Sequence, residues 1–176
     1  MTKFGFSIFL EDKTGRLTGS EFIDVYDRMR FVLRRTVHEP THTAYILYNA
    51  ANSKPVAALD YGPHNALGSV TFSPTNVIPM KKYLTKTSDT SHGSRKFTAS
   101  DGQEYIWSYR QQVDQEWTCT NTSGYLIAYY SLKTPGEPDY PGSSGCTLTI
   151  EEPFGHLAAE MLVSLLVMRH IAAHNL

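Results

Sequence analysis

The C-terminal stretch of the chain, residues 153–174, constrains the fold more than any other feature of the sequence. Between Leu157 and Met168 its polar side chains are Glu160 and Ser164, which are four residues apart and so share one narrow stripe of a helix. The rest of the circumference is apolar. A helix of this kind is either buried inside a protein or placed in a membrane.

A membrane anchor is the less favoured of these two alternatives. A helical span needs about 20 apolar residues, whereas the apolar core at 161–168 is much shorter, and Glu160 would be costly in lipid. Arg169 and His170 follow this core directly. We therefore expect a helix over about 153–174 that is buried in its own protein.

Residues 1–151 carry a different pattern, with short runs rich in Phe, Tyr, Val, Ile and Thr between clusters of Gly, Pro, Asn, Asp and Ser. The expected strands are 4–10, 21–25, 29–37, 44–48, 56–61, 69–72, 77–84, 95–99, 104–109, 117–121, 126–132 and 147–150. Because no helical segment separates them, neighbouring strands must pair antiparallel. The polar stretches 87–94 and 134–145 are expected loops.

These two patterns together predict the architecture. A dozen antiparallel strands leave exposed sheet edges, which closure into a barrel removes. A barrel of well over eight strands has an interior too wide for side chains alone to fill, and a helix that is apolar on every side suits that interior. We predict a mainly β fold of about 12 antiparallel strands in a closed or nearly closed barrel around a buried apolar C-terminal helix. The 176 residues are expected to form a single domain, 1–176.

Composition argues against several classes of protein. The formal net charge is −1, from 16 Lys+Arg and 17 Asp+Glu, which argues against a binder of duplex nucleic acid. Two cysteines, Cys119 and Cys146, are too few for a disulfide scaffold, and we expect reduced thiols, although the sequence leaves a single disulfide open. The N-terminal residues lack the pattern of a signal peptide, so we expect a cytoplasmic protein. The sequence indicates no cofactor.

Three segments resemble an uncharacterised domain family of mushroom-forming fungi: FTASDGQEYIW at 97–107, GYLIAYY at 124–130 and MRHIAAHNL at 168–176. The pattern of the whole chain also resembles the tubby C-terminal-like fold, which is shared by tubby domains, phospholipid scramblases and plant LURP-one-related proteins. These resemblances imply a fungal source and a closed antiparallel barrel around a C-terminal helix. Several relatives of that fold act at membrane phospholipids. The resemblances supply no catalytic residues.

The first of these segments is interpreted as structural. Asp101 and Gly102 predict a type I′ hairpin turn, because Asp-Gly readily supplies positive φ angles. Tyr105 and Trp107 are two residues apart and therefore share one face of the strand that follows. Trp117 lies on the next expected strand, where it could form an aromatic ladder with Trp107.

The candidate catalytic residues are Glu160, His156 and His170. Glu160 is either a carboxylate that bonds an Arg, Tyr or His of the barrel, or a carboxyl group with a raised pKa in a ligand cavity. His156 precedes Glu160 by four residues, as His170 precedes His174, and this spacing can bind a metal. Two ligands do not make a site, so we predict no metal. The sequence has no Gly-rich phosphate loop, nucleophile elbow or HExxH motif.

The candidate ligand-binding residues are cationic. Arg28, Arg30 and Arg34 fall on one face of the expected strand 29–37 and could bind an anionic head group or a phosphate. The alternative is a solvated face balanced by nearby acidic residues. Arg169 is a further candidate, whose alternative role is to interact with the C-terminal end of its helix. A second basic group is interpreted as protection of a strand end: Lys81, Lys82 and Lys86.

Three functions fit these observations. The first is a binding module for a lipid or another hydrophobic or anionic small molecule, with peripheral membrane contact and no transmembrane span. The second is a small-molecule enzyme that uses a barrel-end pocket near Glu160 and its neighbouring histidines. The third is a protein-interaction or structural domain, which the Pro-rich stretch 134–145 would suit. The sequence leaves the ligand and the oligomeric state open.

Overall fold

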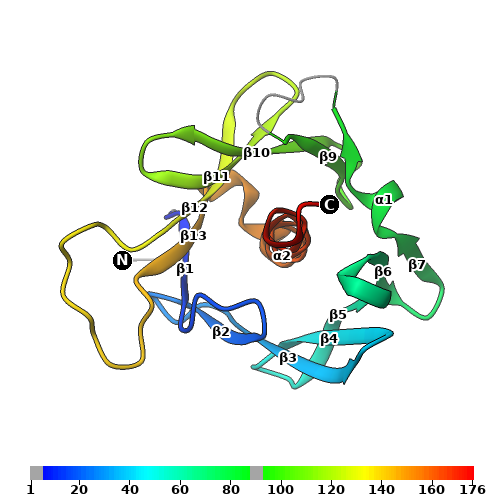
Figure 1. The fold of residues 1–176 in the computed structure, drawn as a ribbon. Helices are drawn as coiled ribbons and strands as arrows, with labels where there is room; N and C mark the ends of the chain where they lie inside the picture. Colours follow the sequence, from blue (N-terminus) through cyan, green and yellow to red (C-terminus); the bar gives the residue numbers. More distant parts are fainter. Residues whose placement is uncertain (1–5, 88–92) are drawn as a thin grey trace.

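The computed structural model describes residues 6–87 and 93–176, and it contains one antiparallel sheet of 13 strands curled around a helix (Figure 1). The strands are β1 (Ile8–Asp12), β2 (Gly19–Asp24), β3 (Arg30–Glu39), β4 (His42–Asn49), β5 (Lys54–Tyr61), β6 (Leu67–Ser73), β7 (Asn76–Pro79), β8 (Thr85–Lys86), β9 (Arg95–Thr98), β10 (Glu104–Gln112), β11 (Gln115–Asn121), β12 (Leu126–Ser131) and β13 (Cys146–Ile150). The helices are η1 (Pro63–Asn65), α1 (Met80–Tyr83), η2 (Glu152–Leu157) and α2 (Ala158–His174). The mainly β class and the antiparallel pairing are therefore confirmed.

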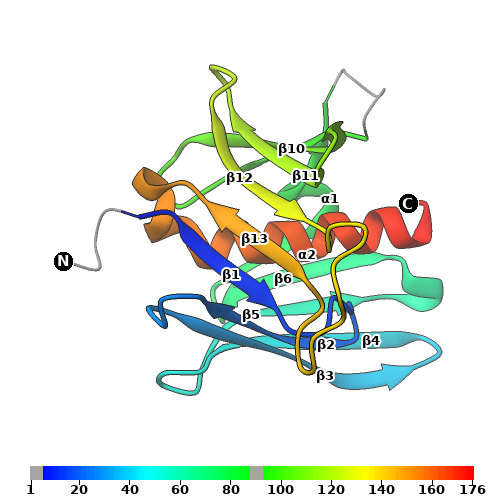
Figure 2. The ribbon, with the colours of Figure 1, turned by 90° about the vertical axis from the view of Figure 1, so that its left-hand side faces the viewer.

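The sheet consists of two meanders that are joined by the first and last strands. Strands β1 to β7 pair in sequence order, as do β8 to β13, and β1 pairs with β13. The register places Ile8 opposite Ile150 and Asp12 opposite Cys146. Figure 2 shows β1 and β13 side by side across the helix. Because η2 and α2 follow β13 directly, this pairing sets the point at which the chain turns into the interior.

Hydrogen bonds do not close this sheet. Its two ends are β7 and β8, and no strand ladder joins them in the described part of the chain. The short helix α1 lies between them, so the predicted strand 77–84 is wrong in its second half. Met80, Tyr83 and Leu84 are buried. This spacing of three and four residues is helical, whereas a strand would bury alternate residues.

Helix α2 lies in the centre of the curled sheet, as predicted (Figure 1). Every residue from 161 to 168 is buried. The stretch Glu152–His174 is long and apolar enough to cross a membrane, yet 67% of its apolar window is buried inside the protein. The N-terminal part of the predicted helix differs, because 152–157 form the 3-10 helix η2 and the α-helix begins at Ala158.

The narrow polar stripe of α2 bonds to the strands around it. The Trp107 indole Nε1 donates to Ser164 Oγ at 2.8 Å, and Ser164 Oγ donates to the Met161 carbonyl at 3.0 Å. Trp107 is fully buried, so its N–H needs this partner. The expected ladder of Trp107 with Trp117 is wrong, because the register places Trp117 opposite Tyr109, with ring centroids 4.9 Å apart.

The predicted hairpin at Asp101 and Gly102 joins β9 to β10, with a different turn type. Gly102 has a φ of +78°, while Asp101 is not among the described residues with positive φ. A type I′ turn requires positive φ at both central positions. The Gly102 N–H instead donates to the Ala99 carbonyl at 3.0 Å, and the Tyr105 hydroxyl donates to Asp101 at 2.5 Å. Tyr105 and Trp107 both face the core, as the alternation predicts.

The remaining expectations concern the two cysteines and the expected loops. Cys119 and Cys146 are buried free thiols, and burial raises the pKa of Cys119 well above its ordinary value. The stretch 134–145 forms a long loop without strand or helix between β12 and β13. Residues 4–5 of the expected strand 4–10 and residues 88–92 of the expected loop 87–94 lie outside the described residues.

Replacing Ser164 with Ala tests the contact between helix and sheet. The substitution leaves the buried indole N–H of Trp107 without an acceptor, so we expect the free energy of unfolding to fall by about 1 to 3 kcal/mol. Urea denaturation measures this value. Ser123→Ala, at an exposed residue in the turn between β11 and β12, is the control. An unchanged urea midpoint for Ser164→Ala would show that this hydrogen bond contributes nothing to stability.

Candidate functional site

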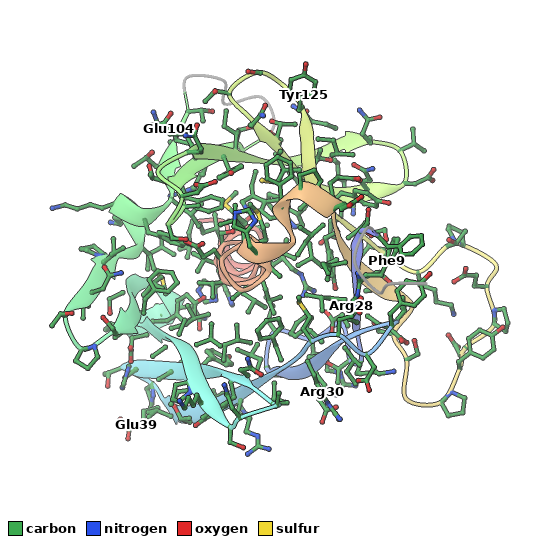
Figure 3. The ribbon with its side chains drawn as sticks, turned by 180° about the vertical axis from the view of Figure 1, so that it is seen from behind. Phe9, Arg28, Arg30, Glu39, Glu104 and Tyr125 are labelled. Atoms are coloured by element: carbon green, nitrogen blue, oxygen red, sulfur yellow. The ribbon has the colours of Figure 1, made fainter. Side chains whose placement is uncertain are left out.

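The outer face of β3 and its neighbours carries two of the predicted ligand-binding residues. The strand buries Phe31 and Leu33 and turns Arg30, Val32 and Arg34 outward. This is the alternation expected for a strand that is covered on one side. Figure 3 shows Arg30 pointing away from the sheet.

Apolar side chains lie beside these arginines on the neighbouring strands. The register places Val32 opposite Tyr48, Arg34 opposite Ile46, and Ile46 opposite Ala58. These four apolar residues are half-buried. We call this surface the arginine face, and it comprises Arg30, Val32, Arg34, Ile46, Tyr48 and Ala58.

The charges of the arginine face are only partly neutralised. Arg30 pairs with Glu21 at 2.5 Å, but both side chains are more than 40% exposed, so solvent screens the pair and its net contribution is small. The Arg34 guanidinium lies 6.0 Å from the Tyr48 ring centroid, and no carboxylate pairs with it within 6–87 and 93–176. With Glu21 on the same side of the sheet, opposite Val32, Arg30 and Arg34 leave an excess of one positive charge at this surface.

Arg28 does not belong to this face, which corrects the expectation that three arginines share it. Arg28 lies in the turn before β3, where its Nε donates to Asp24 at 2.7 Å and its guanidinium donates to the carbonyls of Phe6 and Ser7 at 3.1 and 2.7 Å. Burial would raise the pKa of Asp24, but hydrogen bonds from Arg28 and the backbone hold it below its ordinary value. Arg28 thus acts as a structural cation.

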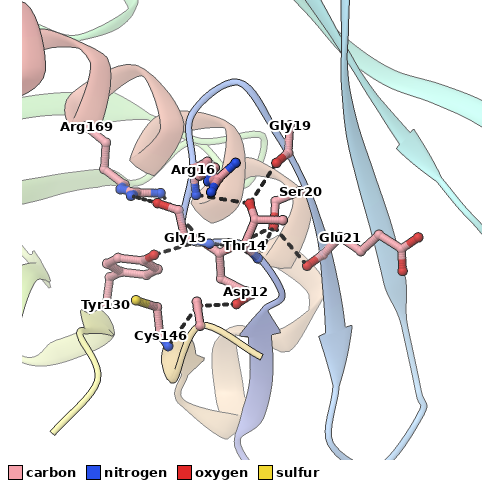
Figure 4. A network of polar contacts seen from close by, with 11 residues as sticks. Asp12, Thr14, Gly15, Arg16, Gly19, Ser20, Glu21, Tyr130, Cys146 and Arg169 are labelled. Atoms are coloured by element: carbon pink, nitrogen blue, oxygen red, sulfur yellow. Dashed lines mark hydrogen bonds and ion pairs between the residues drawn. The ribbon is translucent and has the colours of Figure 1, made fainter. Parts of the chain in front are cut away.

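Arg169 is also held inside the protein. Its guanidinium donates to the Gly15 carbonyl at 2.8 Å and lies 3.5 Å from the Asp12 carboxylate and 4.6 Å from the Tyr130 ring centroid (Figure 4). Its side chain is only 11% exposed. These contacts leave it little access to a ligand, in contrast to its predicted role.

Asp12 is the residue of this network that sequence reasoning missed. Its fully buried carboxylate accepts hydrogen bonds from the Gly15 N–H at 2.9 Å, the Tyr130 hydroxyl at 2.7 Å and the Ser20 hydroxyl (Figure 4). Burial raises the pKa of Tyr130 above its ordinary value, so the hydroxyl stays protonated and donates. In the sequence, Asp12 looks like the end of a strand before a Lys-Thr-Gly turn, which gives no signal of burial.

The three candidate catalytic residues are not brought together. The Glu160 carboxylate accepts hydrogen bonds from the Ser100 N–H at 2.8 Å and the Ser100 hydroxyl at 2.7 Å, not from an arginine, tyrosine or histidine. His156 is exposed on η2. Glu160 and His170 are ten residues apart on α2, about 15 Å along its axis. No group of three or more metal-ligating His, Cys, Asp or Glu residues occurs among the described residues.

His170 is packed against aromatic rings. Its ring stacks on Tyr61 with centroids 3.7 Å apart, and its Nε2 bonds the Asn65 carbonyl at 2.8 Å, so this nitrogen carries the proton. Burial lowers the pKa of His170 to about 4, with the Asn65 bond opposing and nearby His174 adding to the shift. His170 is therefore neutral at physiological pH.

Glu160 lines neither of the two best-formed hollows among the described residues. One, of about 10 Å³, lies beside His170 and Tyr61 and holds no more than a water molecule. The other, of about 470 Å³, is an open depression between 110–116 and 132–135. The pocket beside Glu160 that the enzyme hypothesis requires is therefore not supported.

The Asp12–Arg169 pair predicts a large effect of a single substitution. Arg169→Met removes the cation from a buried carboxylate, so we expect the free energy of unfolding to fall by about 3 kcal/mol. Arg16→Met, at an exposed arginine nearby, should change it by less than about 0.5 kcal/mol. Chemical denaturation measures both. Equal stability of the two variants would contradict the importance of the buried pair.

His170 predicts a pH dependence of stability. Its pKa is about 4 in the folded protein and about 6.5 in the unfolded chain. Above pH 6.5 the imidazole of His170 is neutral in both the folded and the unfolded protein, so it does not make the free energy of unfolding depend on pH. As pH falls from 6.5 to 4, the unfolded chain binds the proton first, so stability falls by roughly 2 to 3 kcal/mol and then levels off. His170→Phe should remove this component from the stability–pH profile, and an unchanged profile would contradict it.

Comparisons with known proteins give a family match and one solved structure of low similarity. Residues 26–173 match the family of unknown function DUF6593. No curated protein matches the chain. A solved structure of an Arabidopsis thaliana protein is similar with 11% identity and a TM-score of 0.42, and the match covers 93% of this chain and 91% of that one.

Proposed function

We propose that this chain, which belongs to the family of unknown function DUF6593, binds lipids. In this proposal the chain binds anionic membrane surfaces through its arginine face. The observation that carries the proposal is the outward pair Arg30 and Arg34, set among half-buried apolar side chains, with Arg34 free of a carboxylate partner in the described structure.

The chemistry of arginine supports this proposal. A guanidinium group presents a planar fork of donors that matches a phosphate, and it is more weakly hydrated than an ammonium group. Near an anionic leaflet each basic residue contributes about 1 kcal/mol of binding free energy. Because the net charge of the chain is −1, this attraction has to be local to the face rather than general.

The filled interior favours a surface over an enclosed ligand. Residues 161–168 of α2 are buried on all sides, and the hollow beside His170 has a volume of only about 10 Å³. A hydrophobic ligand of lipid size needs a pocket of at least about 300 Å³. The outer face of β2–β5 offers a broad area instead, so we assign the lipid to the outside of the sheet.

The resemblance in sequence pattern adds to the proposal. The chain resembles the tubby C-terminal-like fold and the fungal domain family described above, and several relatives of that fold act at membrane phospholipids. We extend this behaviour to the present chain as part of the proposal. No observation on Glu160, His156 or His170 favours the alternative of an enzyme.

Vesicle flotation tests the proposal. We expect the protein to float with vesicles of phosphatidylcholine and phosphatidylserine and not with phosphatidylcholine alone. Arg30→Glu combined with Arg34→Glu should weaken binding at least about tenfold, since two attractive charges become repulsive.

The matched control reverses two other exposed cations. Lys81→Glu with Lys82→Glu changes the net charge by the same amount, on α1 rather than on the arginine face. This control should bind like the unmodified protein. Flotation that is absent for the unmodified protein, or equal loss in both double variants, would contradict the proposal.

A further inference from the structure

An exposed apolar cluster forms where the turn between β2 and β3 lies against the start of β1. Val25 is 58% exposed, Tyr26 49% and Phe6 45%. The Tyr26 ring centroid lies 6.0 Å from that of Phe6 and 6.4 Å from that of Phe9. We call Phe6, Phe9, Val25 and Tyr26 the tip patch. Turns usually carry Gly, Pro, Asn, Asp and Ser, so Val and Tyr at this tip need an explanation.

The tip patch is held rigidly in its exposed position. The Val25 N–H donates to the Phe9 carbonyl at 3.0 Å. Arg28 donates to the Phe6 carbonyl at 3.1 Å, and its guanidinium lies 5.3 Å from the Tyr26 ring centroid. The fold itself therefore holds this surface in place before any partner binds.

The interior of the protein has no space for the side chains of the tip patch. Leu10 and Phe22, on the inner faces of the same two strands, are fully buried. Protein interiors are close-packed, so no further ring fits beside them. Exposure of the tip patch is thus a fixed property of the surface.

The tip patch lies between the cations of the arginine face and one exposed carboxylate of its own turn, Asp27. Ile23, two residues before Val25, is opposite Arg30 in the register. Figure 3 shows Phe9, Arg28 and Arg30 on one side of the molecule. Aromatic and apolar side chains next to cations suit the boundary between head groups and acyl chains, where rings bury their apolar bodies and arginines reach phosphates.

We infer that the tip patch inserts into this boundary of an anionic bilayer while Arg30 and Arg34 contact the lipid phosphates. The inference rests on the proposed function, and adds which residues enter the membrane and how the protein is oriented on it. A bilayer is favoured over a protein partner because Arg30 and Arg34 point outward on the strand next to the tip patch, and cations beside apolar side chains match an anionic lipid surface.

Substitution of the tip patch tests the insertion. Val25→Ser with Tyr26→Ser should reduce flotation with phosphatidylserine-containing vesicles by about tenfold, because the apolar area that enters the membrane is lost. Val113→Ser with Tyr125→Ser is the matched control, since Val113 is 102% and Tyr125 71% exposed elsewhere. Thermal unfolding of both variants checks that they remain folded.

A fluorescence measurement gives a second, independent readout. Tyr26→Trp places an indole in the tip patch, while the native Trp107 and Trp117 are 0% and 2% exposed and stay inside the protein. We expect lipids brominated on the acyl chain to quench the introduced indole and to leave the emission of the unmodified protein unchanged.

The outcomes separate the two proposals. If the unmodified protein floats, and the tip-patch variant floats equally or the introduced indole is not quenched, the insertion is wrong and binding by the arginine face stands. If only the tip-patch variant loses binding and the arginine variant does not, the arginine face is wrong, and the inferred orientation is overturned with it because Arg30 and Arg34 then do not contact the phosphates. If the unmodified protein does not float, or if Val25→Ser with Tyr26→Ser instead converts a dimer to a monomer in size-exclusion chromatography, the insertion is overturned.

Discussion

The structure depends on one constraint, the burial of a helix that is apolar on every side. Residues 161–168 of α2 have no face polar enough to be exposed to solvent, so other parts of the protein have to surround them. A flat sheet covers only one side of a helix. The 13-stranded sheet curls around the helix instead, and in strands such as β1, β2 and β3 the outward residues alternate with buried ones.

This arrangement also explains the buried ion pair. Arg169 follows the apolar core of α2 and would lose its hydration inside the ring, and the fully buried Asp12 lies 3.5 Å from it. Asp12 ends β1, the strand that joins the two halves of the sheet through β13. The pair thus connects the end of the helix to the seam of the sheet. A buried pair of this kind is weak evidence for net stability, but removing one partner is costly because it leaves an uncompensated buried charge.

The interior of the curled sheet is filled by α2, and the proposed binding surface lies on the outside of the sheet. Ser164 of the helix is bonded by Trp107 of β10 in the interior, and Glu160 is bonded by Ser100 of the turn between β9 and β10. Outside, Arg30 and Arg34 stand among half-buried apolar residues, and an ordered aromatic cluster lies at the adjacent turn. This distribution of polarity supports the proposal that the outer face binds an anionic membrane surface.

The sequence by itself determined the mainly β class, the antiparallel pairing, the buried C-terminal helix and the outward direction of Arg30 and Arg34. Each of these follows from local periodicity, which the residues carry wherever they are placed. It predicted a strand at Met80–Tyr83 because a single turn of helix is too short for its period to be seen.

Only the tertiary structure decided the rest. Arg28 was removed from the arginine face by contacts with Asp24 and with the carbonyls before β1, which lie more than 20 residues away. Arg169 is held inside the protein by its ion pair with Asp12, which lies 157 residues earlier in the chain. The unclosed end of the sheet depends on α1, and the pairing of β1 with β13 on the register of distant strands. Contacts over such separations leave no period in the sequence, because each partner alone is an ordinary charged or apolar residue.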